Sequence, residues 1–203
     1  MMPSFQADQL VPFILHTLQA SFSSATRLYD LSIEGLQEAA APGAIGPPQT
    51  FMVEAYLGAE QLHTTSQWDI LLLSTDAHIA LHTLLGKTCQ LHTALSDGSR
   101  TTTTGLINQA ALLGSEGGLA RYKLHVVDWT WMLGQSMASR VWQDTSVLDI
   151  VGSIFQRYAP QAAWSVSDEV GPFLAQAHNA SNRSYCVQFR ETDLAFVRRL
   201  LAE

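Results

Sequence analysis

The chain has 203 residues, of which 47% are hydrophobic and 14% are charged, and its formal net charge is -7 at pH 7. This length and apolar content are enough for one domain and part of a second. The acidic balance excludes the broad basic surface that a phosphate backbone requires, so nucleic acid is not an expected partner.

The first 26 residues carry an amphipathic pattern. Apolar side chains recur at helical spacing from Leu10 through Ile14 to Leu18 and predict a helix over residues 8–23, either a lid on the first domain or a docking helix for a neighbouring subunit. No Lys or Arg precedes Arg27, so a secretory signal is not predicted. No segment reaches the roughly 20 apolar residues of a membrane span. We therefore expect a cytoplasmic protein, unless a machine exports it.

After Arg27 the apolar period changes to two. The alternation over residues 29–33 and the apolar run 51–57 predict strands, and the proline-rich residues 38–49 between them predict a loop. Residues 74–87 leave two alternatives open. They can hold a short helix from Ala77 to Leu85 closed by Gly86, or a strand that leads into a tight turn.

Three further strands are predicted in sequence. Apolar residues alternate over 89–95, a long run extends over 100–113, and alternation returns over 122–126. Asp97-Gly98 favours a tight hairpin turn, and the glycines of residues 114–118 favour a second reversal. Sequential strands joined in this way form an antiparallel meander, the core of a barrel or sandwich.

Past Trp129 the period becomes helical. Apolar side chains predict a helix over residues 147–158, with Asp144 or Thr145 as its cap and Pro160 as its stop. A second helix is predicted from about Thr192, and no stop signal precedes the last residue. We therefore expect the chain to be the first portion of a longer protein. The fold class is mainly β with an α+β part.

A search for reactive groups finds no catalytic constellation. His78 and His82 have the spacing of two metal ligands on one helix face, but no Glu follows the first His and no third ligand is evident, so a polar helix face is the better interpretation. Cys89 and Cys186 are expected to be small buried hydrophobes. No catalytic residue, cofactor or metal is predicted.

Three tryptophans, Trp129, Trp131 and Trp142, allow two interpretations. They can form a stacking platform for a sugar or a base. Tryptophans at the exit of a strand more often plug a core or anchor an interface, and we favour that interpretation.

Several motifs together resemble one family. They are Val53-Glu54-Ala55, Leu84-Leu85-Gly86-Lys87, LGSEGGLARYKL at 113–124, the pair Trp129 and Trp131, SRVWQDTSVLDI at 139–150 and YCVQFRETDLAFVRRLLAE at 185–203. Their order is similar to the N-terminal region of VgrG proteins, the spike proteins of the type VI secretion system, which are related to contractile-phage baseplate hubs and the phage late control protein D family. The chain departs from the family pattern at Thr103-Thr104-Gly105 and at Thr145.

The resemblance implies an antiparallel β-barrel hub (tube) domain over residues 27–128, preceded by the helix within 1–26 and followed over 129–203 by the start of an α/β insertion domain. It implies a structural protein and not an enzyme: a homotrimer that caps a hexameric secretion tube and carries effector or adaptor proteins. This part would make no membrane contact and would be exported by the machine without a signal peptide. The motifs also suggest candidate interaction residues: Trp129, Trp131, Trp142, Arg140, Arg190 and Asp193.

Other classes of function stay open beside this one. The alternatives are a small-molecule or glycan-binding β-barrel, a phage-tail baseplate hub, and an enzyme built on scattered His and Asp side chains. Burial of Trp129 and Trp131 would argue against the glycan-binding barrel. A histidine held in a pocket against a carboxylate with a displaced pKa would favour the enzyme.

Overall fold

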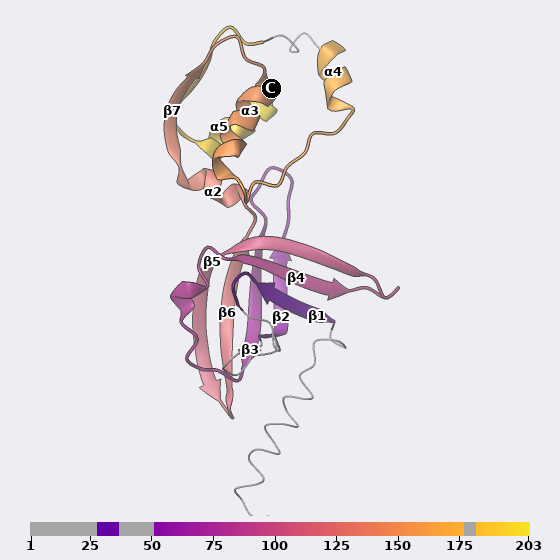
Figure 1. Cartoon of the computed structure of the whole chain (residues 1–203), viewed down its shortest axis with the longest axis vertical. Helices are drawn as coiled ribbons and strands as arrows, with labels where there is room; N and C mark the ends of the chain where they lie inside the picture. The colour runs from indigo at the N-terminus through magenta and orange to yellow at the C-terminus, as the bar shows by residue number, and fades with distance from the viewer. Residues whose placement is uncertain (1–27, 37–50, 177–181) are drawn as a thin grey trace, which may run out of the picture. The chain divides into compact units, whose positions relative to one another are not determined.

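The computed structural model describes residues 28–36, 51–176 and 182–203, which form two compact units (Figure 1). The first unit contains Trp68–Val126 and the described residues up to Gly58, and the second contains Ala59–Gln67 and the described residues from Val127 to Glu203. The helix predicted over residues 8–23 and the loop predicted over 38–49 lie outside the described residues. Within the described ranges, no helix is long and apolar enough to cross a membrane.

The first unit is one six-stranded sheet with the strand order β1-β4-β5-β6-β3-β2. Its strands are β1 (Tyr29–Ile33), β2 (Met52–Ala59), β3 (Gln67–Ser74), β4 (Thr88–Ala94), β5 (Arg100–Glu116) and β6 (Leu119–Val127). The sheet curls, so that Tyr29 and Tyr56 from its two end strands meet edge to face with ring centroids 5.1 Å apart. The mainly-β fold class is confirmed, with the barrel present as a curled half-barrel.

Both predicted reversals are confirmed as hairpin turns. The first joins β4 to β5, where Gly98 has a φ of +85° and the Ser99 N–H donates to Asp97 Oδ1 at 2.9 Å. The second joins β5 to β6 through Gly117 and Gly118, whose φ angles of +61° and +80° favour glycine. The three strands are neighbours in the sheet, so the meander is confirmed as well.

Residues 74–87 follow neither alternative in full. Only the 3-10 turn η2 (Leu81–Thr83) is helical. The helix is interrupted early because Asp76 Oδ1 accepts the N–H of His78 at 2.7 Å, a local bond that competes with helical hydrogen bonding. Gly86 does adopt a positive φ of +74° and its N–H donates to the Ile107 carbonyl at 2.8 Å, which ties the segment to β5.

The core of the first unit gathers alternate side chains of neighbouring strands. Ile70 and Leu72 of β3 and Tyr122 and Leu124 of β6 are almost completely buried. The Tyr122 hydroxyl donates to the Asp76 carbonyl at 2.8 Å, so its polar end is satisfied inside the core. A period of two in the sequence thus becomes one apolar face of the sheet.

The second unit combines helices with a two-stranded antiparallel sheet. Its elements are α2 (Thr130–Gln135), β7 (Met137–Trp142), α3 (Val147–Phe155), η3 (Gln156–Tyr158), α4 (Val170–Gln176), β8 (Cys186–Thr192) and α5 (Asp193–Leu201). Strands β7 and β8 form the sheet. The core packs Ile150 and Ile154 of α3 with Phe196 and Leu200 of α5. Both predicted helices are confirmed.

The predicted cap of α3 is wrong by one or two positions. Ser146 is the N-cap, and its Oγ accepts the N–H of Asp149 at 3.1 Å. Asp144 cannot serve because its φ is +51°, outside the extended conformation that an N-cap adopts. The backbone of Thr145 is also engaged, since it exchanges two hydrogen bonds with Arg183.

The approach of β2 to β3 yields a test of the fold. A Cβ added at Gly58 would lie 2.6 Å from Cδ1 of the buried Trp68, so we expect Gly58→Ala to destabilise the first unit by about 1–3 kcal/mol. Gly114→Ala on β5 is the control, because nothing lies within 4 Å of its added Cβ. Urea unfolding should place only the Gly58 variant at a lower midpoint. Equal midpoints would contradict the close approach.

Candidate functional site

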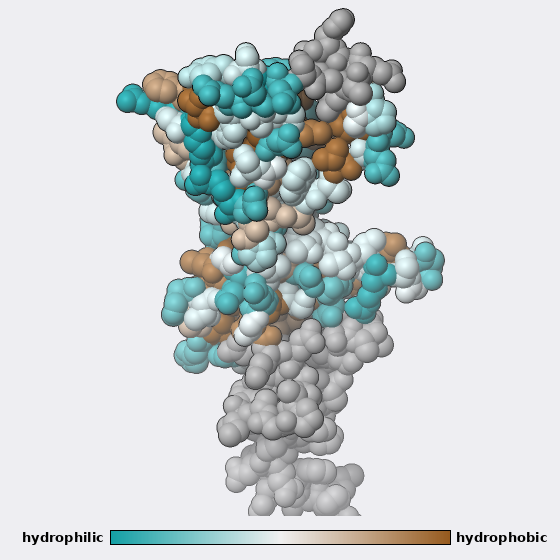
Figure 2. Space-filling view, turned by 45° about the horizontal axis from the view of Figure 1, so that its top comes forward, coloured by the Kyte–Doolittle hydropathy of each residue, from teal (hydrophilic) through white to brown (hydrophobic). Residues whose placement is uncertain are grey.

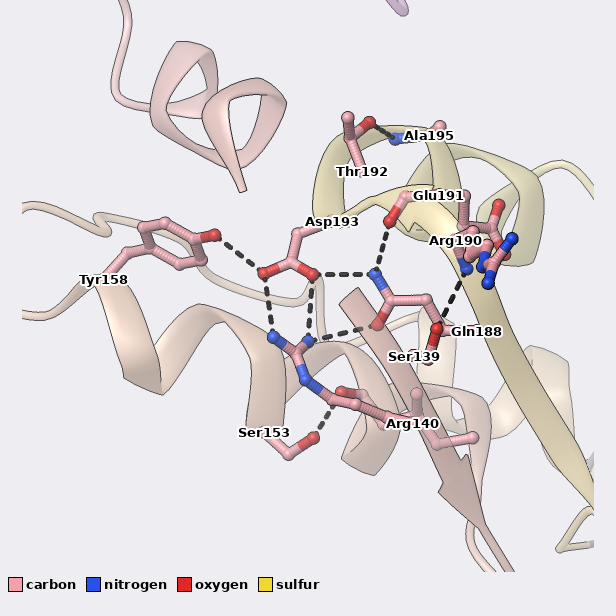
Figure 3. A network of polar contacts seen from close by, with 11 residues as sticks. Ser139, Arg140, Ser153, Tyr158, Gln188, Arg190, Glu191, Thr192, Asp193 and Ala195 are labelled. Atoms are coloured by element: carbon pink, nitrogen blue, oxygen red, sulfur yellow. Dashed lines mark hydrogen bonds and ion pairs between the residues drawn. The ribbon is translucent and has the colours of Figure 1, made fainter. Parts of the chain in front are cut away.

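A buried polar network holds the second unit together (Figure 3). Its centre is Asp193, which is fully buried, and Arg140, whose Nη1 lies 2.9 Å from Asp193 Oδ1. The Tyr158 hydroxyl donates to Asp193 Oδ2 at 2.7 Å, and Gln188 Nε2 donates to Oδ1 at 2.8 Å. One carboxylate therefore joins β7, η3, β8 and the start of α5.

Gln188 completes the network from β8. Its Oε1 accepts from Arg140 Nη1 at 3.1 Å, and its Nε2 also donates to the carbonyl of Glu191 at 3.1 Å. The side chain has no exposed surface, so these bonds offset the cost of burying an amide.

A β-bulge and a helix N-terminus position the side chains of this network. Residues Phe189 and Arg190 together oppose Ser139, because the strand register shifts between Ala138 and Arg140. Two residues against one is a β-bulge, and the φ of +49° at Arg190 belongs to it. At the turn into α5, Thr192 Oγ1 accepts the N–H of Ala195 at 3.1 Å. Asp193 thus occupies the first turn of a helix, where a negative charge is favoured.

The electrostatics of the network keep Asp193 ionised. Burial by itself would raise the pKa of Asp193, but hydrogen bonds from Gln188, Tyr158 and Arg140 outweigh it and hold the pKa below its usual value. Burial, together with the bond to Asp193, raises the pKa of Tyr158. A carboxylate fixed in this way is a structural anchor and a poor proton acceptor at neutral pH.

The predicted tryptophans have different surroundings. Trp129 packs edge to face on Phe155 at 4.9 Å, and its indole N–H donates to the Ala163 carbonyl at 3.1 Å. Trp142 stacks on Phe196 at 5.1 Å, and both tryptophans pack against the core of the second unit. Trp131 is half-buried on α2. For Trp129 and Trp142 this is the core role, and an interaction role for any of the three stays a prediction.

Of the other three predicted site residues, two are in the interior of the second unit and one is at its surface. Arg140 and Asp193 meet in the buried network, whereas Arg190 is exposed with its guanidinium carbon 5.5 Å from the ring centroid of Phe189. Their interaction with partners is likewise still a prediction. Gln188 and Tyr158 were not predicted from the sequence. In the sequence, Tyr158 follows the apolar period of a helix and so reads as a core residue. Gln188 lies within an alternating strand, where a single Gln does not indicate a buried polar network.

One histidine does lie against a carboxylate with a displaced pKa. His125 Nδ1 is 2.8 Å from Asp69 Oδ1 and Lys123 Nζ is 3.0 Å from Oδ2. The bond from His125 is the main cause that lowers the pKa of Asp69. A hollow of about 580 Å³ in the first unit is lined by other residues, Leu73, Leu119 and Arg121 among them. The three side chains therefore form a partly exposed charged cluster on the β3–β6 surface.

Both cysteine side chains are buried. Cys89 and Cys186 are free and buried, and burial raises the pKa of Cys89 to about 12. Within the part of the chain that the structure describes, no three His, Cys, Asp or Glu side chains gather in a group that could hold a metal ion.

Comparison with protein families gives a match over both units. The model of the phage tail baseplate hub (GPD) family matches residues 59–203. Among curated proteins, the type VI secretion system spike protein VgrG1b of Pseudomonas aeruginosa is 29% identical over 146 residues, which are 72% of this chain and 18% of that protein. VgrG1a of the same organism is 26% identical over 156 residues, 77% of this chain and 23% of that protein. The chain thus spans about a fifth of the length of these relatives.

Solved structures agree with this match. The E. coli c3393 protein, described as a component of the type VI secretion system with structural similarity to the T4 tail proteins gp27 and gp5, superposes with a TM-score of 0.62 and 26% identity, over 85% of this chain and 42% of that one. The 43 kDa tail protein of prophage MuSo2 from Shewanella oneidensis has a TM-score of 0.51 at 13% identity, over 85% of this chain and 46% of that one, and shows the fold alone.

The buried ion pair predicts a large effect of Arg140→Met. The substitution leaves the Asp193 carboxylate buried without its cation, so we expect the second unit to lose about 3–5 kcal/mol of stability. Hydrogen exchange of peptides from residues 186–203 would report it. Arg121→Met is the control, because Arg121 pairs with Glu54 at the surface and its loss should cost less than about 1 kcal/mol. Equal protection in both variants would refute the anchor role.

The lowered pKa of Asp193 predicts a pH dependence. Its ionised form stabilises the second unit above the ordinary Asp pKa of about 3.9, and this contribution is lost as the pH falls through the lower folded value. Tyr158→Phe removes one bond to the carboxylate, so the Asp193 pKa should rise and the loss should begin at a higher pH. Carboxyl carbon NMR would follow the titration, with the exposed Tyr185→Phe as control. An unchanged Asp193 titration in Tyr158→Phe would contradict this account.

Proposed function

The chain belongs to the phage tail baseplate hub family, and from that premise we propose that it forms the hub region of a type VI secretion spike. It would serve as a structural part of the puncturing device and would work by assembly, not by catalysis. The observation that carries the proposal is the family match, which extends from the end of β2 through strands β3 to β6 and the whole described second unit. Relatives named as type VI spike proteins match 77% and 72% of the chain.

The assembly that we propose follows from this family. Within the complete spike, the region would form a homotrimer that caps the hexameric tube and carries effector or adaptor proteins. The machine itself would export it, with no secretory signal peptide. The curled sheet supports this proposal, because a hub is expected to be built on a barrel-like sheet of this kind. The buried network would keep the second unit rigid within the assembly.

A phage-tail baseplate hub is the second candidate. The E. coli c3393 protein combines a place in the type VI secretion system with structural similarity to the T4 tail proteins gp27 and gp5, so a hub with the same architecture can belong to either machine. A glycan-binding barrel is less well supported, because Trp129 is engaged by Phe155 and by the Ala163 carbonyl.

The test is a chimeric spike in secretion-competent cells. Residues 51–203 of this chain would replace the matching region of a complete VgrG protein, and release of the tube protein into the medium would be measured. Release supports the proposal, because only an assembled spike permits firing. Cells that carry the same chimera with Arg140→Met should release less tube protein, because the substitution destabilises the second unit. A chimera that is stable and abundant but never supports release would overturn the proposal.

A further inference from the structure

The segment that connects β2 to β3 belongs to the second unit. Residues Ala59–Gln67, here called the strap, join two strands of the first unit, yet they are grouped with residues from Val127 onward. Most strap residues are exposed, so the strap buries little apolar surface that could hold it in place. Specific hydrogen bonds therefore have to account for its position.

The tip of the strap is a self-contained turn. The Thr64 N–H donates to the Gln61 carbonyl at 3.3 Å, and the φ of +65° at His63 suits the third position of such a turn. Leu62, within this turn, is 91% exposed. Figure 2 shows hydrophobic side chains at several separate places on the face that it views, and single exposed apolar residues are ordinary. The tip therefore gives no reason for the position of the strap.

Two hydrogen bonds join the strap to Asp128. The Ser66 N–H donates to Asp128 Oδ2, and the Asp128 N–H donates to the Ser66 carbonyl at 3.0 Å. The two residues are 62 positions apart in the chain, so this reciprocal pair is a tertiary contact. The carboxylate acceptor makes its bond stronger than a bond between two neutral groups.

The other carboxylate oxygen of Asp128 serves α2. Oδ1 accepts the Thr130 N–H at 2.8 Å and also the Thr130 hydroxyl. An Asp side chain that binds the backbone two residues ahead forms an Asx turn, which here leads into α2. Because each oxygen is committed to a different segment, one carboxylate couples the strap to the start of the helix.

We propose that Asp128 is a clasp that holds the strap closed on the second unit, and that the strap opens locally when this clasp is broken. The hydrophobic cores of both units would stay intact, because their residues lie outside the strap. Segments with few buried apolar contacts are the ones that open locally in folded proteins. This inference concerns the chain by itself and is independent of the proposed function.

The substitution Asp128→Asn separates the two halves of the clasp. It keeps one acceptor oxygen and replaces the other with an NH2 group, which cannot accept a hydrogen bond. The remaining oxygen has two donors at Thr130 and one at Ser66, so we expect it to stay with Thr130. The strap then loses its bond while α2 keeps its Asx turn.

Hydrogen exchange of the full chain, resolved to single amides by NMR, tests the proposal. We expect the Ser66 amide to exchange about tenfold to a hundredfold faster in Asp128→Asn, because it loses a hydrogen bond to a charged group. Ser66 is distant from residue 128 in the sequence, so its intrinsic exchange rate stays the same. The amides of α5 should keep their protection, since the core of the second unit remains folded.

Two matched variants serve as controls. Asp97→Asn removes the same charge and a bond to the Ser99 N–H at a hairpin turn of the first unit. Thr130→Val removes only the hydroxyl bond to Asp128 Oδ1. Neither should speed the exchange of the Ser66 amide. Equal exchange of Ser66 in the wild type and in Asp128→Asn would overturn the inference. A loss of protection that extends through α5 would also overturn it, because the strap would then open only together with the second unit.

Discussion

The second unit depends on a buried charge that must be fully coordinated. A carboxylate without exposed surface, Asp193, is tolerable only because a guanidinium, a phenol and an amide converge on it. Burying such a pair costs several kcal/mol in desolvation for each ion, and removal of either partner leaves that cost uncompensated. The network therefore specifies geometry more than it adds stability. Strand β7, strand β8 and the 3-10 turn η3 must all be in place before Asp193 can be buried.

This requirement also determines which face of the β7–β8 sheet points into the second unit. Because side chains alternate along a strand, directing Arg140 and Gln188 inward directs Val141 and Val187 outward. The bulge at Arg190 preserves this relation up to the start of α5. The apolar outer face is thus a direct consequence of the polar inner one. A single register therefore fixes both the buried network of the unit and the side chains on the exposed face of its sheet.

Most strands, turns and helices of this fold could be predicted from local sequence patterns, but the hydrogen-bond network around Asp193 could not. Alternation and paired glycines specify a hairpin within a few residues, which is why the turns at Gly98 and Gly117 could be predicted. The helix beginning at Asp193 is predictable from its period and the Thr192 cap. Tyr158 and Gln188 meet Asp193 only after three elements pack, and no short window of sequence contains that contact. The same reason explains the cap at Ser146, since pairing of Thr145 with Arg183 depends on a distant segment.

The two units place their ion pairs differently: at the surface in the first unit and in the interior in the second. In the first unit, ion pairs such as Arg121 with Glu54 lie on the sheet surface over an apolar core, and each contributes little. In the second unit the central ion pair of Arg140 and Asp193 is buried beside the apolar core. The ionised groups of this network serve the structure and give no sign of a reactive site. The exposed side chains of Met137 and Phe189 on these strands follow from the same alternation that buries Gln188.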